Sequence, residues 1–228
     1  MQKTIAFVDW LINKGLMLVS LIVFLVGCYF VLDIQYVYDH AAAGGIAARR
    51  QERAVSEVMQ ELSDEAVAWL TLDDTGIDYP VMQTDNNTKY LNVDPYGNYS
   101  LSGSIFLDFR NSSDFSDGYS IVYGHHMSND YMFGALDRYE EVGYFNAHRT
   151  GTLTIDNAEH KLNVFAFGIM EATEEIVFSP DDENNVRDYI KNHALIYRAP
   201  GDGNIIMLST CRDPGEATRT LFFVEMLD

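Results

Sequence analysis

The side chains best suited to chemistry lie near the C-terminus, where Cys211 shortly precedes Arg219. The apolar run over 204–208 predicts a buried strand leading to the cysteine, the Asp-Pro-Gly sequence at 213–215 predicts a turn, and 220–227 predicts the next strand. Two adjacent strands would hold the thiol and the guanidinium side by side. A thiol attacks only as the thiolate, and an arginine stays charged and can donate several hydrogen bonds to a developing oxyanion. The pair predicts nucleophilic catalysis at a carbonyl group and still requires a base.

The candidate base is His125, which follows an alternating, strand-like stretch over 119–123 and Gly124. Histidine has an unperturbed pKa near neutrality, which suits proton exchange with a cysteine and then with a leaving amine. Because His125 and Cys211 are far apart in the sequence, only folding can bring them together. The adjacent His126 is a second imidazole that could modulate His125 or substitute for it.

Two short stretches resemble the sortases, the cysteine transpeptidases of Gram-positive bacteria. They are Leu208-Ser209-Thr210-Cys211 followed by Arg219, and Tyr123-Gly124-His125. Met207 stands where the first threonine of the family's strand-end motif is expected, and His126 stands where class B sortases commonly carry asparagine. The resemblance implies that Cys211 is the nucleophile, that His125 is the general acid and base, and that Arg219 is the donor to the oxyanion or the substrate carbonyl.

The resemblance also implies an activity, a substrate class and partners. The enzyme would cleave a C-terminal sorting motif of the NPxTx or LPxTx kind after its threonine and hold the protein as a thioester. It would then transfer the protein to an amine acceptor, with no metal or cofactor. The expected acceptor is a cell-wall peptide, with a pilin lysine as the alternative and hydrolysis as a side reaction. Ser209 and Thr210, just before Cys211, are the residues expected to contact the sorting peptide.

Three other functions for the thiol compete with this interpretation. A secreted cysteine protease would share the thiol and imidazole, but it would normally orient the imidazole with Asn or Asp and would not need Arg219. A non-enzymatic surface binding module would bury Cys211 as a small apolar residue. A zinc site is disfavoured, because the only other cysteine is Cys28 and the sequence has no CxxC or HExxH motif.

The N-terminal part of the chain predicts a membrane anchor. Residues 1–14 are expected to be a short cytoplasmic N-terminus, and 15–34 a transmembrane signal anchor built on an uncharged apolar run. Lysines before the run and aspartates after it favour an exported body, so the catalytic domain is expected outside a single-pass membrane protein. A cleaved signal peptide is the alternative, since the alanines at 41–43 resemble a cleavage site, but the apolar run is longer than a usual signal-peptide core.

Residues 35–66 are expected to join the anchor to the catalytic domain. The Ala-Ala-Ala-Gly-Gly stretch at 41–45 predicts a flexible joint, and helix-forming residues from Ile46 to about Leu70 predict an amphipathic helix. Its apolar stripe, which includes Val58 and Leu62, would dock on the catalytic domain. A membrane-surface helix using the arginines at 49, 50 and 53, or a stalk, remains the alternative.

Residues 67–228 are expected to form a mainly β catalytic domain. Eight strand-like stretches separated by turn signals favour a barrel or sandwich, and the resemblance implies an eight-stranded sortase-type barrel. The expected strands are 67–72, 77–82, 104–107, 120–123, 151–155, 161–169, 204–209 and 221–226. Helical insertions are expected at 132–145 and 181–193, the second capped by Ser179-Pro180-Asp181-Asp182. This second helix would be either a wall of the substrate groove or a solvated surface helix.

The charge of the chain restricts its partners. Lys and Arg number 15 against 34 Asp and Glu, which gives a formal net charge of −19. Such an acidic chain repels polyanions, so nucleic acid is excluded as a partner and broad adhesion to anionic lipid is disfavoured.

Overall fold

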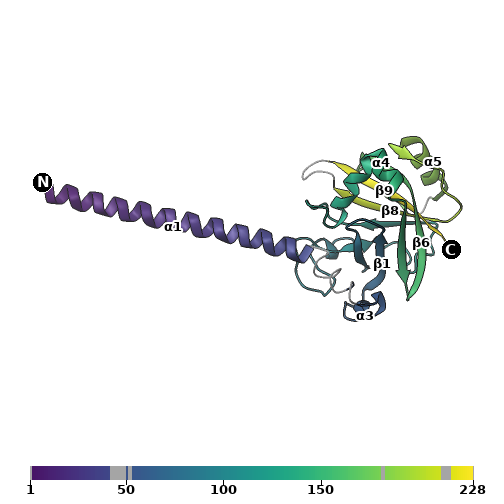
Figure 1. The fold of residues 1–228 in the computed structure, drawn as a ribbon, viewed down its shortest axis with the longest axis horizontal. Helices are drawn as coiled ribbons and strands as arrows, with labels where there is room; N and C mark the ends of the chain where they lie inside the picture. Colours follow the sequence, from purple (N-terminus) through teal and green to yellow (C-terminus); the bar gives the residue numbers. More distant parts are fainter. Residues whose placement is uncertain (1, 42–49, 51–52, 181–182, 212–216, 228) are drawn as a thin grey trace. The chain divides into compact units, whose positions relative to one another are not determined.

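The structure is a computed structural model that describes residues 2–41, 50, 53–180, 183–211 and 217–227. It divides into two compact units, Met1–Asp39 and His40–Asp228 (Figure 1). The division of the chain into cytoplasmic, transmembrane, joint and catalytic segments at 14, 34 and 66 stays a prediction.

The first unit is a single helix, α1 (Gln2–Ala41). Its span Ile5–Asp39 is long and apolar enough to cross a membrane, and its large apolar side chains are exposed. The helix extends beyond the predicted span of 15–34 at both ends. No proline interrupts residues 2–41, and the flanking polar positions are occupied by residues that a helix tolerates.

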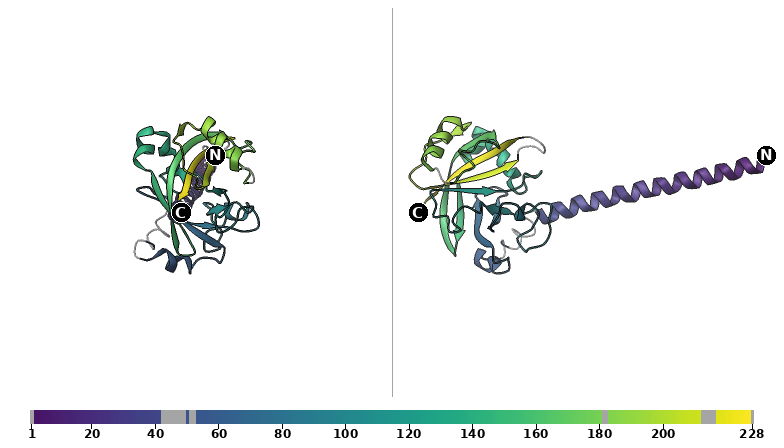
Figure 2. Two further views of the ribbon diagram at one scale, coloured as in Figure 1. Left: turned by 90° about the vertical axis from the view of Figure 1, so that its right-hand side faces the viewer. Right: turned by 180° about the vertical axis from the view of Figure 1, so that it is seen from behind.

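The second unit is built on one closed sheet. Its strands are β1 (Ala66–Leu72), β2 (Asp78–Met82), β3 (Ile105–Leu107), β4 (Tyr119–Tyr123), β5 (Thr150–Ile155), β6 (Ala158–Glu171), β7 (Ile196–Tyr197), β8 (Asn204–Cys211) and β9 (Thr218–Leu227). Their order is β5-β1-β2-β3-β4-β8-β9-β6-β7, and an additional β5–β6 pairing closes the first eight into a barrel. The predicted eight-stranded barrel is therefore confirmed, and Figure 2 shows it from two further sides.

The strand β7 was not predicted. It has two residues and, among the described strands, pairs with β6 alone, outside the closed ring. So short a strand has no alternating pattern that a sequence could reveal.

Alternation along β8 and β9 gives the barrel wall an inner and an outer apolar face. Ile206 and Leu208 belong to the interior cluster, whereas Ile205 and Met207 belong to a second cluster on the outside. Helix α5 (Glu183–His193) covers this outer cluster with Val186 and Ile190, both fully buried. The helix is therefore docked on the barrel rather than solvated all round, and Asp181 and Asp182 of its predicted cap lie outside the described residues.

The other predicted helical insertion, 132–145, is confirmed in a modified form. It consists of a 3₁₀ helix, η2 (Phe133–Glu140), followed by α4 (Val142–Ala147). Phe133, Leu136 and Tyr139 of η2 are fully buried in the interior cluster.

The predicted helix from Ile46 to about Leu70 is wrong beyond α3 (Val55–Met59). The chain turns at Ser63, where the backbone N–H of Ala66 donates to the Ser63 carbonyl, and then joins the sheet as β1. The strand predicted at 67–72 is confirmed, because the β-favouring segment 66–72 pairs with β2 and β5 instead of continuing the helix. The positions 46–49, 51 and 52 and the expected joint at 42–45 lie outside the described residues.

The docking of this segment on the barrel is confirmed. Val58 and Leu62 are buried against Trp69 of β1. Figure 1 shows α3 at the end of the barrel opposite α4 and α5.

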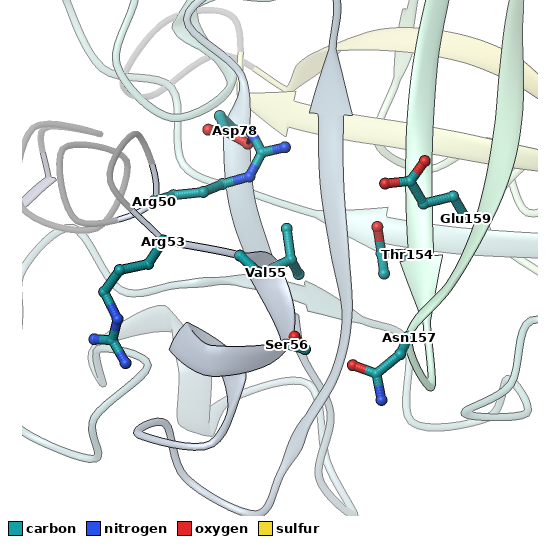
Figure 3. Close-up of a pocket in the computed structure, with 9 residues that line it drawn as sticks. Arg50, Arg53, Val55, Ser56, Asp78, Thr154, Asn157 and Glu159 are labelled. Atoms are coloured by element: carbon teal, nitrogen blue, oxygen red, sulfur yellow. Dashed lines mark hydrogen bonds and ion pairs between the residues drawn. The ribbon is translucent and has the colours of Figure 1, made fainter.

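A carboxylate clamp reinforces the docking. One oxygen of Asp78, Oδ1, accepts hydrogen bonds from Arg50 Nη1, from Trp69 Nε1 at 2.7 Å and from Thr71 Oγ1 at 2.9 Å. Arg50 and Asp78 lie at the wall of a hollow of about 470 Å³, whose other side is formed by the β5–β6 turn (Figure 3).

Arg53 pairs with Glu57 and Glu61. The described arginines of this segment are thus paired within the chain, which favours docking over a membrane-surface role.

Replacing Asp78 with alanine is expected to lower the free energy of unfolding by about 2 kcal/mol, because it leaves the Arg50 guanidinium and the Trp69 indole N–H without their acceptor. Urea unfolding of the detergent-solubilised protein measures this change. Asp64→Ala, which removes an exposed carboxylate from the same region, is the control and is expected to change stability by less than about 0.5 kcal/mol. Equal effects of the two substitutions would contradict the clamp.

Candidate active site

A cavity of about 270 Å³ lies where β4 and β8 end and β9 begins. Its lining residues are Asn87, Leu91, Phe106, Tyr123, Gly124, His125, Ser209, Thr210 and Arg219. Four of the five residues predicted to form the site are therefore brought together in one cavity. The fifth, Cys211, is placed by its backbone as the last residue of β8, and its register partner on β9 is Arg219.

The topology explains this convergence. Strands β4 and β8 are parallel neighbours, with Tyr123 opposite Ser209, and Gly124 N–H donates to the Ser209 carbonyl at 3.1 Å. Parallel strands end at the same edge of a sheet, so the residues that follow β4 emerge beside the end of β8. His125 and Cys211, distant in the sequence, are thus carried to one edge. Antiparallel pairing of β8 with β9 then adds Arg219.

The His125 ring is oriented by a backbone carbonyl. Its Nε2 lies 2.9 Å from the carbonyl oxygen of Leu91. A carbonyl can only accept, so Nε2 carries a proton and Nδ1 is the nitrogen left to exchange a proton with another group. Among the described residues, this carbonyl is the hydrogen-bond partner of the ring.

The position of that carbonyl is itself fixed. Leu91 ends the 3₁₀ helix η1 (Lys89–Leu91), whose central residue, Tyr90, is buried and donates its hydroxyl proton to Glu65. Burial and the Glu65 carboxylate raise the pKa of Tyr90 to about 12, so the phenol remains protonated and keeps this bond. The backbone N–H of Ser104 also donates to the Tyr90 carbonyl at 2.9 Å.

His126 is directed elsewhere. Its Nε2 lies 2.7 Å from Oδ2 of Asp137 on η2, and it is not among the described residues that line the cavity. Of the two neighbouring imidazoles, the geometry favours His125 as the one available to the cavity.

Arg219 retains hydrogen-bond donors for a ligand. Among the described residues, its guanidinium makes one long hydrogen bond, from Nη1 to the Thr218 carbonyl at 3.4 Å. A guanidinium has five N–H donors, so an anionic oxygen in the cavity can be held by the others.

Ser209 and Thr210 are both about 2% exposed and line the cavity from β8. The Thr210 hydroxyl has no hydrogen-bond partner among the described residues. No described residue of α5 lines the cavity, so the prediction that this helix walls the substrate groove gains no support.

The remaining wall was not predicted from the sequence. It consists of Asn87, Leu91, Phe106 and Tyr123. Tyr123 belongs to the stretch that carries the family resemblance, but nothing in the spacing of Asn87 or Leu91 relates them to a residue of β4. Burial and the neighbouring Asp108 carboxylate raise the pKa of Tyr123 far above its usual value, so its hydroxyl stays protonated.

Gly124 is required by the close packing beneath His125. A Cβ at this position would lie 2.4 Å from Cδ1 of Ile105 and 2.6 Å from Cδ2 of Phe133. Both neighbours are buried in the interior cluster and have little room to move.

Gly124→Ala is therefore expected to lower the free energy of unfolding by about 2 kcal/mol through overpacking and to displace His125. Thermal unfolding and the rate of Cys211 alkylation by iodoacetamide measure the two effects. Gly143→Ala, in exposed α4, is the control, because its Cβ would meet only the flexible end of Glu141. A Gly124→Ala protein as stable and as reactive as the parent would contradict this packing argument.

Comparisons with known proteins agree with the fold. No family model matches the sequence. Sortase B of Listeria monocytogenes is 32% identical over 162 residues, which cover 67% of this chain; the chain spans 65% of that relative's length.

Solved structures match more of the barrel. A Streptococcus pyogenes class B sortase involved in pilus biogenesis is 33% identical and superposes with a TM-score of 0.70, covering 76% of this chain and 98% of that one. A Staphylococcus aureus sortase B–substrate complex is 25% identical with a TM-score of 0.69, covering 83% of this chain and 93% of that one. The 33% identity to the Streptococcus pyogenes enzyme extends over nearly the whole of that class B sortase, and the closed barrel is the same. The chain therefore belongs to the class B sortases.

Proposed function

We propose that the chain is a membrane-anchored cysteine transpeptidase that cleaves a C-terminal sorting motif after its threonine and joins the protein to an amine. The observation that carries the proposal is the convergence of His125, Arg219 and the end of β8 on one cavity. Cys211 is the nucleophile, His125 the general acid and base, and Arg219 the oxyanion donor.

In the first half-reaction, the Cys211 thiolate attacks the carbonyl carbon of the motif's threonine. A tetrahedral oxyanion forms, and Arg219 and nearby backbone N–H groups stabilise it by hydrogen bonds. When the C–N bond breaks, His125 donates a proton to the departing amine, and a thioester to Cys211 remains. The Leu91 carbonyl, by accepting from Nε2, stabilises the protonated imidazole that this step requires.

In the second half-reaction, the amine of the acceptor attacks the thioester carbonyl. His125 accepts the proton that the amine loses, and the thiolate leaves as the new amide bond forms. The proton balance closes over the two steps, so the chain's own side chains suffice for the transfer.

The substrate is a sorting motif of the NPxTx or LPxTx kind, with Ser209 and Thr210 among the residues that contact it. The buried hydroxyl of Thr210, which has no partner in the described part of the chain, supports such a contact. The acceptor is a cell-wall peptide. A pilin lysine is the second candidate, supported by the Streptococcus pyogenes relative involved in pilus biogenesis.

A two-substrate assay tests the proposed function. The detergent-solubilised protein is incubated with NPxTN-like or LPxTG-like peptides and with either triglycine or a lysine-bearing peptide, and products are identified by mass spectrometry. Formation of a new amide is the expected result. Hydrolysis alone, unaffected by either amine, would favour the cysteine protease, and an intact peptide together with an inert Cys211 would favour the binding module.

Helix α1 supports a single-pass anchor, because it is long and apolar enough to span a membrane. The proposed orientation, with the N-terminus in the cytoplasm and the catalytic domain outside the cell membrane, rests on the lysines before the apolar run and the aspartates after it. Protease treatment of intact protoplasts tests this orientation. Digestion of a C-terminally tagged catalytic domain is expected, and protection of the tag until the membrane is permeabilised would contradict it.

A further inference from the structure

A fully buried carboxylate lies behind the catalytic cavity. Asp108 directly follows β3 and has no exposed surface. Burial opposes its ionisation, but hydrogen bonds from Arg110 and Asn87 hold the pKa of the Asp108 carboxyl below its usual value. The fold depends on these donors, because a buried charge that loses its partners is strongly destabilising.

Two of the groups bound by Asp108 are cavity-wall residues. Its Oδ2 accepts from Asn87 Nδ2 at 2.9 Å and from the Tyr123 hydroxyl at 3.1 Å. Asn87 lies in the loop before η1, and Tyr123 is the last residue of β4. One carboxylate oxygen thus fixes two side chains that reach the cavity from different elements.

The same carboxylate fixes the direction of the Asn87 amide. Oδ1 of Asn87 accepts from the backbone N–H of Phe109 at 3.0 Å, while Nδ2 donates to Asp108. An aspartate can only accept and a backbone N–H can only donate, so the amide has one orientation. Asn87 can therefore donate the second N–H of its Nδ2 to a carbonyl oxygen in the cavity. The Tyr123 hydroxyl proton points toward Asp108 and so away from the cavity.

Arg110 extends this network across the outer face. It forms a two-point contact with Asp108, from Nε to Oδ1 and from Nη2 to Oδ2, each at 2.8 Å. Its Nη2 also donates to the carbonyl of Phe178, in the connection between β6 and α5, at 2.8 Å. Gln83 Nε2 further donates to the backbone carbonyls of Asp108 and Asn111.

We propose that Asp108 is a positioning residue for sorting-peptide binding: it acts through Asn87 and Tyr123, which form the peptide-binding wall of the cavity. The inference rests on the proposed function. The proposed role divides the site into two parts. Cys211, His125 and Arg219 are positioned by the ends of strands, whereas the wall formed by Asn87 and Tyr123 is positioned by the buried Asp108 carboxylate.

Asp108→Asn tests this role because an asparagine keeps the shape and removes half of the acceptor capacity. The asparagine NH₂ group would face a donor at either of the two oxygen positions. At the Oδ2 position it would deprive Asn87 and Tyr123 of their acceptor, and at the Oδ1 position it would deprive Arg110 of one. We expect the acylation efficiency, kcat/KM for the sorting peptide, to fall about tenfold or more, mainly through a higher KM. Alkylation of Cys211 by iodoacetamide, followed by peptide mapping, is expected to proceed at the parent rate, because this small reagent does not use the wall.

A second variant keeps the test decisive if Asp108→Asn fails to fold. Tyr123→Phe keeps the ring packed against Phe106 and removes one donor to Asp108, and we expect about a threefold to tenfold loss of acylation efficiency with unchanged alkylation. Asp114→Asn makes the same charge change on an exposed residue that pairs with Ser116, and it serves as the matched control with unchanged kinetics.

Each outcome is decisive. Folded Asp108→Asn and Tyr123→Phe proteins with parental acylation efficiency would overturn the inference while leaving the proposed function intact. Equal losses of acylation and alkylation would also overturn it, since Asp108 would then support the nucleophile rather than the wall. A parent protein that forms no acyl-enzyme with any peptide would overturn both proposals.

Discussion

Replacing His125 with alanine is expected to lower the rate of transpeptidation by about 10²- to 10⁴-fold, the range typical for loss of a general acid and base. The variant can still form a thiolate at high pH, but it has no group positioned to protonate the departing amine. Acylation is expected to fall with the second half-reaction, because both steps move a proton through the same ring. Stopped-flow or quenched-flow measurement of acyl-enzyme formation, over a range of pH, gives the size of the loss.

His126→Asn is the matched control for this prediction. His126 is bonded to Asp137 rather than to the cavity, and an asparagine can still donate a hydrogen bond to that carboxylate. Activity close to the parent level is expected. Should His126→Asn cause the larger loss and His125→Ala the smaller, the roles of the two imidazoles would be reversed.

Arg219→Ala is expected to lower the rate of acylation by about 10²- to 10³-fold, the typical cost of removing one oxyanion donor. Arg219→Lys is expected to recover only part of this loss, because an ammonium keeps the charge but lacks the planar array of N–H donors. The register pairing with Cys211 is the structural reason for so large an effect, since it mounts the guanidinium beside the end of β8.

The control for Arg219→Lys is Arg138→Lys, which makes the same chemical change at an exposed ion pair with Asp130. Rates are measured with saturating peptide, so that weaker binding does not conceal the effect on chemistry. Full activity of Arg219→Ala would remove the feature that distinguishes the sortase interpretation from a cysteine protease.

The site residues could be predicted because each is tied to a local pattern. The apolar run before Cys211 and the strand after the turn define β8 and β9, and adjacent antiparallel strands place Cys211 opposite Arg219 without further information. His125 could be identified as a strand-end residue, but its approach to Cys211 depends on the parallel pairing of β4 with β8. That pairing joins distant segments and was not predicted; the family resemblance implied only that His125 and Cys211 act in one site.

The facing wall could not be predicted, because it is held by contacts between residues with no common pattern. Asn87 and Tyr123 both bond to Asp108, and each lies in a different segment. The Leu91 carbonyl that orients His125 is a backbone group, so no side-chain type marks it. Such positions are defined by tertiary packing rather than by local propensity.

The largest error concerned the segment before the barrel. Helix-favouring residues predicted a helix to about Leu70, and this prediction overlapped the strand predicted at 67–72. The chain is a strand from Ala66, and its backbone pairs with β2 and β5, so the strand prediction is confirmed and the end of the helix was placed too late. The apolar residues Val58 and Leu62 were nonetheless expected at the barrel surface, because the hydrophobic stripe is the same whichever element carries it.

Intact-protein mass spectrometry shows whether Cys211 forms a thioester with the sorting motif. The detergent-solubilised protein is mixed with NPxTN-like and LPxTG-like peptides, quenched in acid and weighed, with Cys211→Ala as the control. We expect a mass gain equal to the peptide fragment that ends at threonine, present in the parent and absent in Cys211→Ala. A folded parent protein with no adduct from any peptide, or an adduct that persists in Cys211→Ala, would contradict it.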